Sequence, residues 1–182
     1  MKIRYFFLAV FAVFSALVYG QAVPEMMYYR FNVPNASSVQ NEASAPVGTN
    51  PSSIAGTGMS VGSTGQFGSA LVGAGTSSTS DYLNTGWATS LSGDWTISFY
   101  TSNITSSSTL YYIFGDNNAS SFRCFTNGVA GSNNWMLRGT GISDVLITGG
   151  ATAAPHVSTF VYDSSVPEIK AYLDGSLQTT VS

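Results

Sequence analysis

Three oxygen-bearing side chains follow one another at residues 116–118, and their chemistry suits a cation site. Asp116, Asn117 and Asn118 offer a carboxylate and two amides, and Asp81 and Asp94 are candidate partners from other loops. Calcium takes six to eight oxygen ligands from groups of this kind. We therefore take Asp81, Asp116 and Asn118 as candidate calcium ligands. The alternative, which we prefer, is an ordinary polar turn, because Asp and Asn are also typical of connections between strands.

Aromatic and polar side chains beside loops point to a second chemistry, the binding of a sugar. Aromatic rings bury large apolar areas against a ligand, while amide and guanidinium groups bond its hydroxyls. Two of the tryptophans follow loop-like stretches, where binding residues tend to lie. Their alternative is packing in the core, which we prefer for both and adopt outright for Trp95. The candidate ligand-binding residues are Trp87, Tyr112, Asn133, Trp135 and Arg138.

The remaining reactive residues do not predict an enzyme. A glycoside hydrolase needs two carboxylates flanking the scissile bond, and the acidic residues of this chain are scattered singly. An aspartate pair assembled in space is the alternative. His156 stands at the start of a predicted strand, where packing or hydrogen-bond contacts are expected in preference to a serine–histidine pair. Cys124 falls on an apolar strand face, which predicts a buried, inert thiol.

The first twenty residues are typical of a secretory signal peptide. Lys2 and Arg4 precede an apolar run over 5–18, and small residues follow at Gly20 and Ala22. The run is shorter than the roughly 20 residues that a membrane-spanning helix needs. Cleavage after Gly20 would leave four basic and nine acidic residues, a net charge of −5. We expect an exported, mildly acidic protein without a membrane span, and an uncleaved anchor is the alternative.

The composition excludes several classes of protein. Six Lys and Arg residues are too few for a nucleic-acid surface. A single Cys and a single His exclude a disulfide framework and a multi-ligand zinc site. Charged residues are only 8% of the chain, so the polar surface comes from Ser, Thr, Asn and Gly. These residues, together with 13% aromatics, favour strands joined by many turns.

Short alternating segments separated by turn residues predict an all-β sandwich or barrel. The clearest hairpin signal is Asp174-Gly175 between two alternating runs. A long Pro- and Gly-rich stretch at 34–66 should contain short strands near Ile54 and 59–61. The other predicted strands cover residues 26–33, 69–72, 81–84, 94–102, 110–114, 121–126, 135–138, 144–148, 156–162, 168–173 and 177–181.

Three motifs of the chain resemble those of the laminin-G-like, or concanavalin A-like, jelly-roll family. Trp95-Thr96-Ile97-Ser98 matches a "F-T-I-S" strand, His156-Val157 part of a "W-H-H-V-A" strand, and residues 172–175 a "Y-V-D-G" hairpin. Pro155 replaces the family's Trp, and the strands that normally follow the hairpin are missing before Ser182. The resemblance covers the chain from about residue 26 and implies an antiparallel two-sheet sandwich over residues 21–182, truncated at its C-terminus.

The resemblance implies a secreted or cell-surface binding module for extracellular polysaccharide or glycan, with calcium as the candidate cofactor. On this reading the chain is part of a larger exported protein and has no catalytic role. A structural or adhesive module with protein partners is the first alternative, and a glycoside hydrolase is the second. Polysaccharide pull-down with and without a chelator separates the first two.

Overall fold

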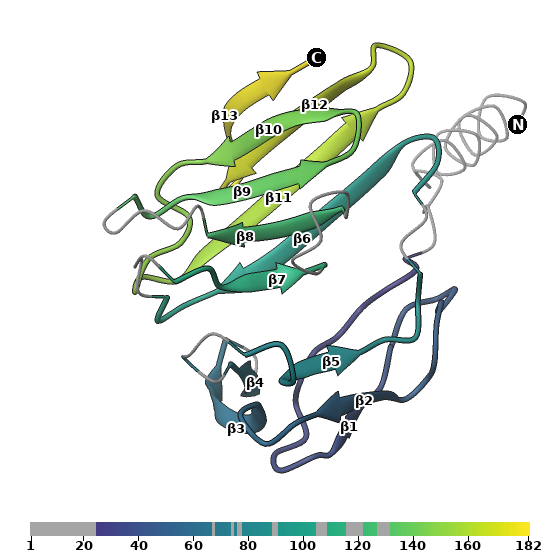
Figure 1. The fold of residues 1–182 in the computed structure, drawn as a ribbon, viewed down its shortest axis with the longest axis vertical. Helices are drawn as coiled ribbons and strands as arrows, with labels where there is room; N and C mark the ends of the chain where they lie inside the picture. Colours follow the sequence, from purple (N-terminus) through teal and green to yellow (C-terminus); the bar gives the residue numbers. More distant parts are fainter. Residues whose placement is uncertain are drawn as a thin grey trace, which may run out of the picture. The chain divides into compact units, whose positions relative to one another are not determined.

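The computed structural model describes residues 25–66, 68–73, 75, 78–88, 91–104, 109–115, 122–126 and 132–182. These residues form antiparallel β-strands and contain no helix, which confirms the all-β prediction (Figure 1). None of them therefore forms a helix long and apolar enough to cross a membrane. The predicted signal peptide at 1–20 lies outside the described residues.

The chain divides into two compact units, which are described separately. Unit 1 comprises the described residues up to Ala55, together with Met59–Val72 and Leu83–Trp87. Unit 2 comprises Gly56–Gly58, Gly73–Tyr82 and Ala88–Ser182. The expectation of one jelly-roll domain over residues 21–182 stays a prediction.

Unit 2 is built from two four-stranded antiparallel sheets, each with a simple strand order (Figure 1). The first sheet has the order β13-β12-β11-β6, and the second has the order β10-β9-β8-β7. The strands of the first are β6 (Trp95–Thr101), β11 (His156–Asp163), β12 (Glu168–Leu173) and β13 (Ser176–Val181). The strands of the second are β7 (Tyr112–Phe114), β8 (Arg123–Thr126), β9 (Trp135–Gly139) and β10 (Ile142–Ile147).

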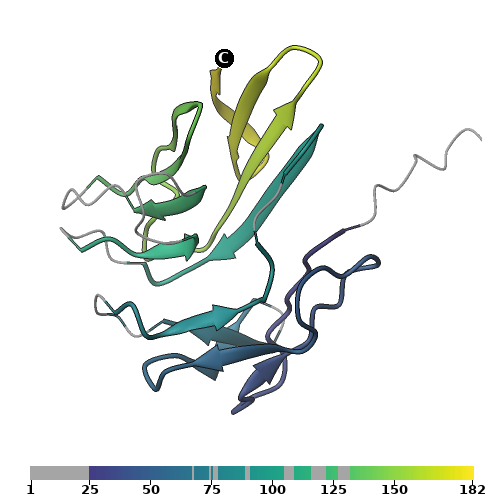
Figure 2. The ribbon, with the colours of Figure 1, turned by 45° about the vertical axis from the view of Figure 1, so that its right-hand side comes forward.

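The two sheets of unit 2, which Figure 2 draws from a second side, share one hydrophobic core. Period-2 alternation directs every second side chain inward, as the sequence predicted for the strand at 94–102. Phe99 of the first sheet meets Trp135 of the second edge to face, with ring centroids 5.6 Å apart. The fully buried core residues are Cys124, Trp135, Leu137, Val145, Ile147, Ala151, Phe160 and Ala171.

Unit 1 contains short strands and a small core. Its three-stranded sheet has the order β1-β2-β5, and a hairpin pairs β3 with β4. Its strands are β1 (Ser38–Val39), β2 (Ser52–Ala55), β3 (Ser60–Gly65), β4 (Gly68–Val72) and β5 (Tyr82–Asn84). The strands β2 and β3 confirm the prediction of short strands near Ile54 and 59–61.

The strand predicted at 26–33 is wrong, because this segment joins none of the sheets. Tyr28 donates its backbone N–H to the Asn41 side chain, at 2.8 Å, instead of to a neighbouring strand. Phe31 has a φ of 56°, which no regular strand contains. Tyr29 and Phe31, which the alternation placed on one face, still stack, with their ring centroids 6.0 Å apart.

The hairpin predicted at Asp174-Gly175 is confirmed. Leu173 pairs with Ser176, so Asp174 and Gly175 form the whole loop between β12 and β13. Both have positive φ, 49° for Asp174 and 80° for Gly175. A two-residue loop with positive φ at both positions matches the right-handed twist of the strands, and Asp-Gly tolerates it well.

Candidate functional site

The outer face of the β7–β10 sheet gathers aromatic, basic and acidic side chains. Because alternate residues of β8, β9 and β10 point into the core, the residues between them point the other way. The pairing places Tyr112 opposite Phe125, Phe125 opposite Met136, and Met136 opposite Leu146. A second row begins with Arg123 opposite Arg138. The outer face is defined here as Tyr112, Arg123, Phe125, Met136, Arg138, Asp144 and Leu146.

Two rings and two guanidinium groups form the centre of this outer face. Tyr112 stacks on Phe125 with ring centroids 5.3 Å apart and planes 26° from parallel. The guanidinium carbons of Arg123 and Arg138 lie 5.2 Å and 5.6 Å from the centroid of the Phe125 ring. Such cation–π contacts are each worth about 0.5–2 kcal/mol. Phe125 is only 4% exposed although it points away from the core, so it supports its neighbours and leaves contact with a ligand to them.

Arg138 is held in place by Asp144. Its Nε donates to Oδ1 at 2.7 Å and its Nη2 to Oδ2 at 2.6 Å, a bidentate ion pair. The hydrogen bond from Arg138 lowers the pKa of Asp144 below its ordinary value, and the same bond raises the pKa of Arg138. Both groups therefore stay charged around neutral pH. Their side chains are 39% and 41% exposed, so the pair is accessible from solvent.

The structure brings together two of the five predicted sugar-binding residues. Tyr112 and Arg138 flank the same phenylalanine ring, as described above. Asn133 lies outside the outer face, in the segment before β9, where its carbonyl accepts a hydrogen bond from Ala151 N–H at 3.0 Å. Trp87 is half-buried and belongs to unit 1.

Trp135 takes the core alternative. None of its side chain is exposed, and its ring packs against Phe99. A ring without exposed surface has no face to offer a ligand, so Trp135 is not a sugar-stacking residue in this structure. Its place beside a polar loop was misleading. Along β9 every second side chain points inward, so Trp135 shares the core-facing side with Leu137.

Sequence reasoning missed five members of the outer face: Arg123, Phe125, Met136, Asp144 and Leu146. Alternation along each strand could have grouped some of them, since Phe125 lies two residues beyond Arg123 and Met136 two before Arg138. The pairing between strands could not be deduced in the same way. It depends on bulges in the β7–β8 and β9–β10 pairs, which shift the register by one residue.

The calcium prediction is only partly open to comparison with the structure. Asp116 and Asn118 lie outside the described residues. Asp81 accepts a hydrogen bond from the Gly58 backbone N–H at 2.8 Å. Hydrogen bonds from the Ser78 side chain and from Gly58 lower its pKa. Among the described residues no three His, Cys, Asp or Glu side chains come together as a metal-binding group.

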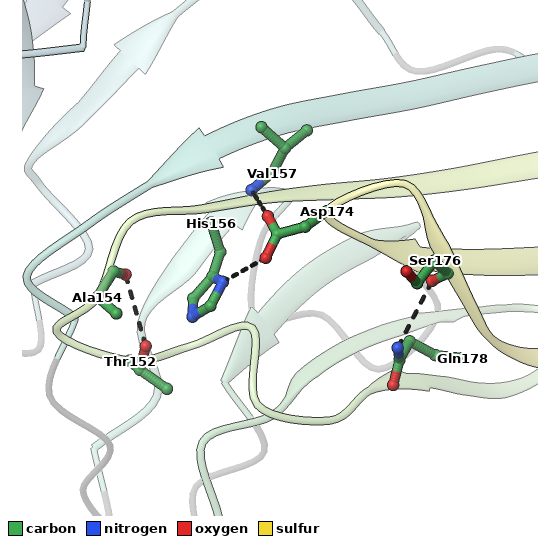
Figure 3. A network of polar contacts seen from close by, with 7 residues as sticks. All are labelled: Thr152, Ala154, His156, Val157, Asp174, Ser176 and Gln178. Carbon is green, nitrogen blue, oxygen red and sulfur yellow. Dashed lines mark hydrogen bonds and ion pairs between the residues drawn. The ribbon is translucent and has the colours of Figure 1, made fainter.

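His156 and Asp174 form a polar contact at the start of β11 (Figure 3). Asp174 Oδ2 lies 2.8 Å from His156 Nδ1, and Asp174 Oδ1 accepts a hydrogen bond from Val157 N–H at 2.9 Å. The carboxylate therefore ties the β12–β13 hairpin to β11. This agrees with the expectation that His156 makes hydrogen-bond contacts at a strand end.

Two other potential nucleophiles, Cys124 and Ser60, lie in surroundings that do not suit catalysis. Cys124 is fully buried, and burial raises the pKa of its thiol. Residues 58–62 read Gly-x-Ser-x-Gly, the pattern of a hydrolase elbow that lies between a strand and a helix. Here Ser60 pairs with Val72 inside the β3–β4 hairpin. The local structure is therefore not the one that exposes a catalytic serine.

Comparison of the chain with family models, with curated proteins and with solved structures finds no significant match.

Proposed function

We propose that this chain is a secreted carbohydrate-binding module and that its ligand docks on the outer face of the β7–β10 sheet. The observation that carries the proposal is the juxtaposition of Tyr112 with the Arg138–Asp144 pair around one supporting ring. Residues 1–20 act as the signal peptide in this proposal. The two sheets of unit 2 form a jelly-roll sandwich of the kind found in the laminin-G-like and concanavalin A-like family.

The side chains of the outer face suit a sugar because they combine apolar area with oriented polar groups. Binding sites are typically apolar surfaces that carry a few polar groups to fix the ligand's orientation. Tyr112 supplies a ring that is braced by Phe125, and Met136 and Leu146 extend the apolar row. Arg138 has five N–H donors, of which Asp144 takes two. Because Asp144 already orients the guanidinium, little conformational entropy is lost when a hydroxyl binds.

Retention on insoluble polysaccharides tests the proposal. The purified chain is passed over a panel of extracellular polymers, and Tyr112→Ala is compared with Tyr82→Ala, which removes the ring of a residue that is 48% exposed and does not belong to the outer face. We expect Tyr112→Ala to weaken retention about tenfold or more, as removal of a central aromatic anchor does. The Tyr82 variant should bind like the wild type. Equal retention of both variants, or no retention of the wild type on any polymer, would contradict the proposal.

The same experiment tests a second function, binding to a protein partner, because the outer face also has the composition of a protein interface. Tyr, Met and Arg are enriched in such interfaces, and Tyr112, Met136 and Arg138 lie together here. A structural or adhesive module would show no retention on any polymer but would bind a protein at the surface. A glycoside hydrolase would release reducing sugar from a retained polymer, and we propose no such activity.

A further inference from the structure

Three buried polar atoms lie at one end of the core of unit 2 without a hydrogen-bond partner among the described residues. They are Trp135 Nε1, Ser158 Oγ and Thr101 Oγ1. Trp135 and Ser158 have no exposed surface at all. A buried N–H or hydroxyl without a partner is unfavourable, because it has given up its hydrogen bonds to water. Most such groups in native proteins are therefore paired, either with protein atoms or with an ordered water molecule.

The register of the strands brings these three side chains to the same end of the core. Thr101 is the last residue of β6 and pairs with His156, the first residue of β11. The neighbouring core-facing pair joins Phe99 to Ser158. Thr101 and Ser158 are therefore diagonal neighbours on the core-facing side of the first sheet. Trp135 is the first residue of β9 in the second sheet, and its ring contacts Phe99.

Gly150 shows that the polar groups of the two sheets converge on one point. It is buried, and a Cβ atom at this position would lie 2.9 Å from Trp135 Cδ1 and 3.0 Å from Ser158 Oγ. Cδ1 is bonded to Nε1 in the indole ring, so the indole N–H and the Ser158 hydroxyl lie in the same small region. These two groups do not bond each other. Glycine at position 150, without a side chain, avoids crowding both of them.

We infer that one water molecule binds here and links the two sheets of unit 2. It accepts a hydrogen bond from Trp135 Nε1–H and bonds the hydroxyls of Ser158 and Thr101. The ligand must accept from the indole, because an indole N–H can only donate, whereas a hydroxyl can donate or accept. Water meets both requirements, and a metal cation does not, since the indole hydrogen would point toward it. Three partners is also the usual number for a buried water molecule.

The inference accounts for a serine at a fully buried position of β11. The next core-facing residue of that strand is Phe160, which packs against Phe99. An apolar side chain at position 158 would continue this packing but would leave the Trp135 N–H without a route to a partner. Ser158 is small enough for the core and supplies the hydroxyl that helps to hold the water.

The Nε1–H signal of Trp135 in the NMR spectrum of the whole chain tests the inference. The signal is assigned by comparison with Trp87→Phe and Trp95→Phe, which remove the other two indole groups. Cross-relaxation between this proton and water is measured in the laboratory frame and in the rotating frame. A bound water molecule gives peaks of opposite sign in the two frames, whereas exchange of the indole proton with solvent gives peaks of the same sign. We expect peaks of opposite sign.

Removing the hydroxyls shows what holds the water. Ser158→Ala and Thr101→Val should each weaken the peak without abolishing it, because two partners of the water remain. The double variant should lose the peak, since a buried water molecule needs at least two partners. Thr159→Val is the matched control: it removes a hydroxyl from the outward side of β11, where Thr159 bonds Ser98, and should leave the peak unchanged.

The Trp95 indole signal and the dispersion of the amide signals show that each variant is folded. A wild-type chain without the peak, or with peaks of the same sign in both frames, would overturn the inference before any variant is made. A peak that disappears in one single variant would mean that the hydroxyl itself, and not a water molecule, contacts the indole. A peak that survives in the double variant, or disappears in Thr159→Val, would equally overturn the inference.

Discussion

The two units of this protein are held together by different interactions. Unit 2 buries large apolar side chains between its two sheets, among them Trp135, Phe160 and Leu137. In unit 1 the buried apolar residues are small, Val39 and Val61 among them, and the polar Asn41 and Ser52 are as deeply buried as they are. A unit that fully buries few large apolar side chains can therefore still adopt one conformation when its polar groups specify it.

Asn41 is the residue that specifies the conformation of unit 1. Its side-chain oxygen accepts hydrogen bonds from the backbone N–H of Tyr28 at 2.8 Å and Ala43 at 3.2 Å. Its side-chain nitrogen donates to the Met26 carbonyl at 2.9 Å. The Asn50 side chain holds the Asn41 backbone in turn: its oxygen accepts from Asn41 N–H at 2.9 Å, and its nitrogen donates to the Asn41 carbonyl at 3.0 Å. One amide thus supplies partners that a neighbouring strand would otherwise give to residues 26–28.

Replacing Phe160 by Ala should produce the largest loss of stability and would test the role of the core in unit 2. A phenylalanine-to-alanine change in a packed core destabilises a protein by about 3–5 kcal/mol, and Phe160 is fully buried beside Phe99. The measurement is guanidinium denaturation followed by tryptophan fluorescence. Val157→Ala, on the outward side of the same strand, should change the stability by only about 0.5 kcal/mol. Similar losses in both variants would contradict the assignment of the core.

Replacing Asn41 by Ala should have a smaller effect, confined to unit 1. Buried backbone groups that lose their partners destabilise a protein by about 1–3 kcal/mol. Hydrogen exchange should show faster exchange at the amides of Tyr28 and Ala43, which bond this side chain. Asn84→Ala is the control, because that exposed side chain accepts one hydrogen bond, from Gly86 N–H. Unchanged protection at Tyr28 in Asn41→Ala would show that the amide does not organise the segment.

The same contrast explains which parts of the fold could be predicted. In unit 2 each main strand carries apolar residues at alternate positions, and packing follows that pattern, so the strands at 94–102, 156–162 and 168–173 were placed within about two residues. The prediction of a strand at 26–33 rested on its aromatic β-formers. It failed because the backbone of this segment bonds the Asn41 side chain and isolated backbone groups of residues 42–47, and not a continuous neighbouring strand. A local sequence pattern does not predict such a hydrogen bond to a side chain distant in the sequence.

The candidate site was predictable by residue type but not by arrangement. Tyr112 and Arg138 were chosen because aromatic and guanidinium groups bind sugars, and the structure does place them around one ring. Phe125 and Asp144, which support them, could not be chosen, since their positions depend on strand register. Trp135 shows the opposite error, in which a residue chosen for its neighbouring loop is buried by the alternation of its strand.

The smallest expected loss of stability comes from changing Asp174. Its carboxylate links the β12–β13 hairpin to β11 by charge and not by apolar packing. Its hydrogen bond from Val157 N–H, and then the His156 side chain, lower the pKa of Asp174. A carboxyl with a lowered pKa in the folded state stabilises the fold above its unfolded pKa of about 3.9, and this contribution is lost as the pH falls through the lowered value. Asp174→Asn keeps a residue that tolerates positive φ and an oxygen acceptor, but it removes the charge.

The wild type should therefore be slightly more stable than Asp174→Asn at neutral pH, and the difference should vanish in acid. Urea denaturation at a series of pH values measures it. His156→Gln, alone and combined with Asp174→Asn, shows how much of the difference passes through the histidine, since the two changes will not add if the groups act together. Asp163→Asn is a control, because that carboxylate bonds Ser165 and lies at the opposite end of β11 from His156. A difference that persists unchanged below pH 2 would mean that the hairpin is held by its turn geometry, as unit 1 is held by its amide, and not by the charge.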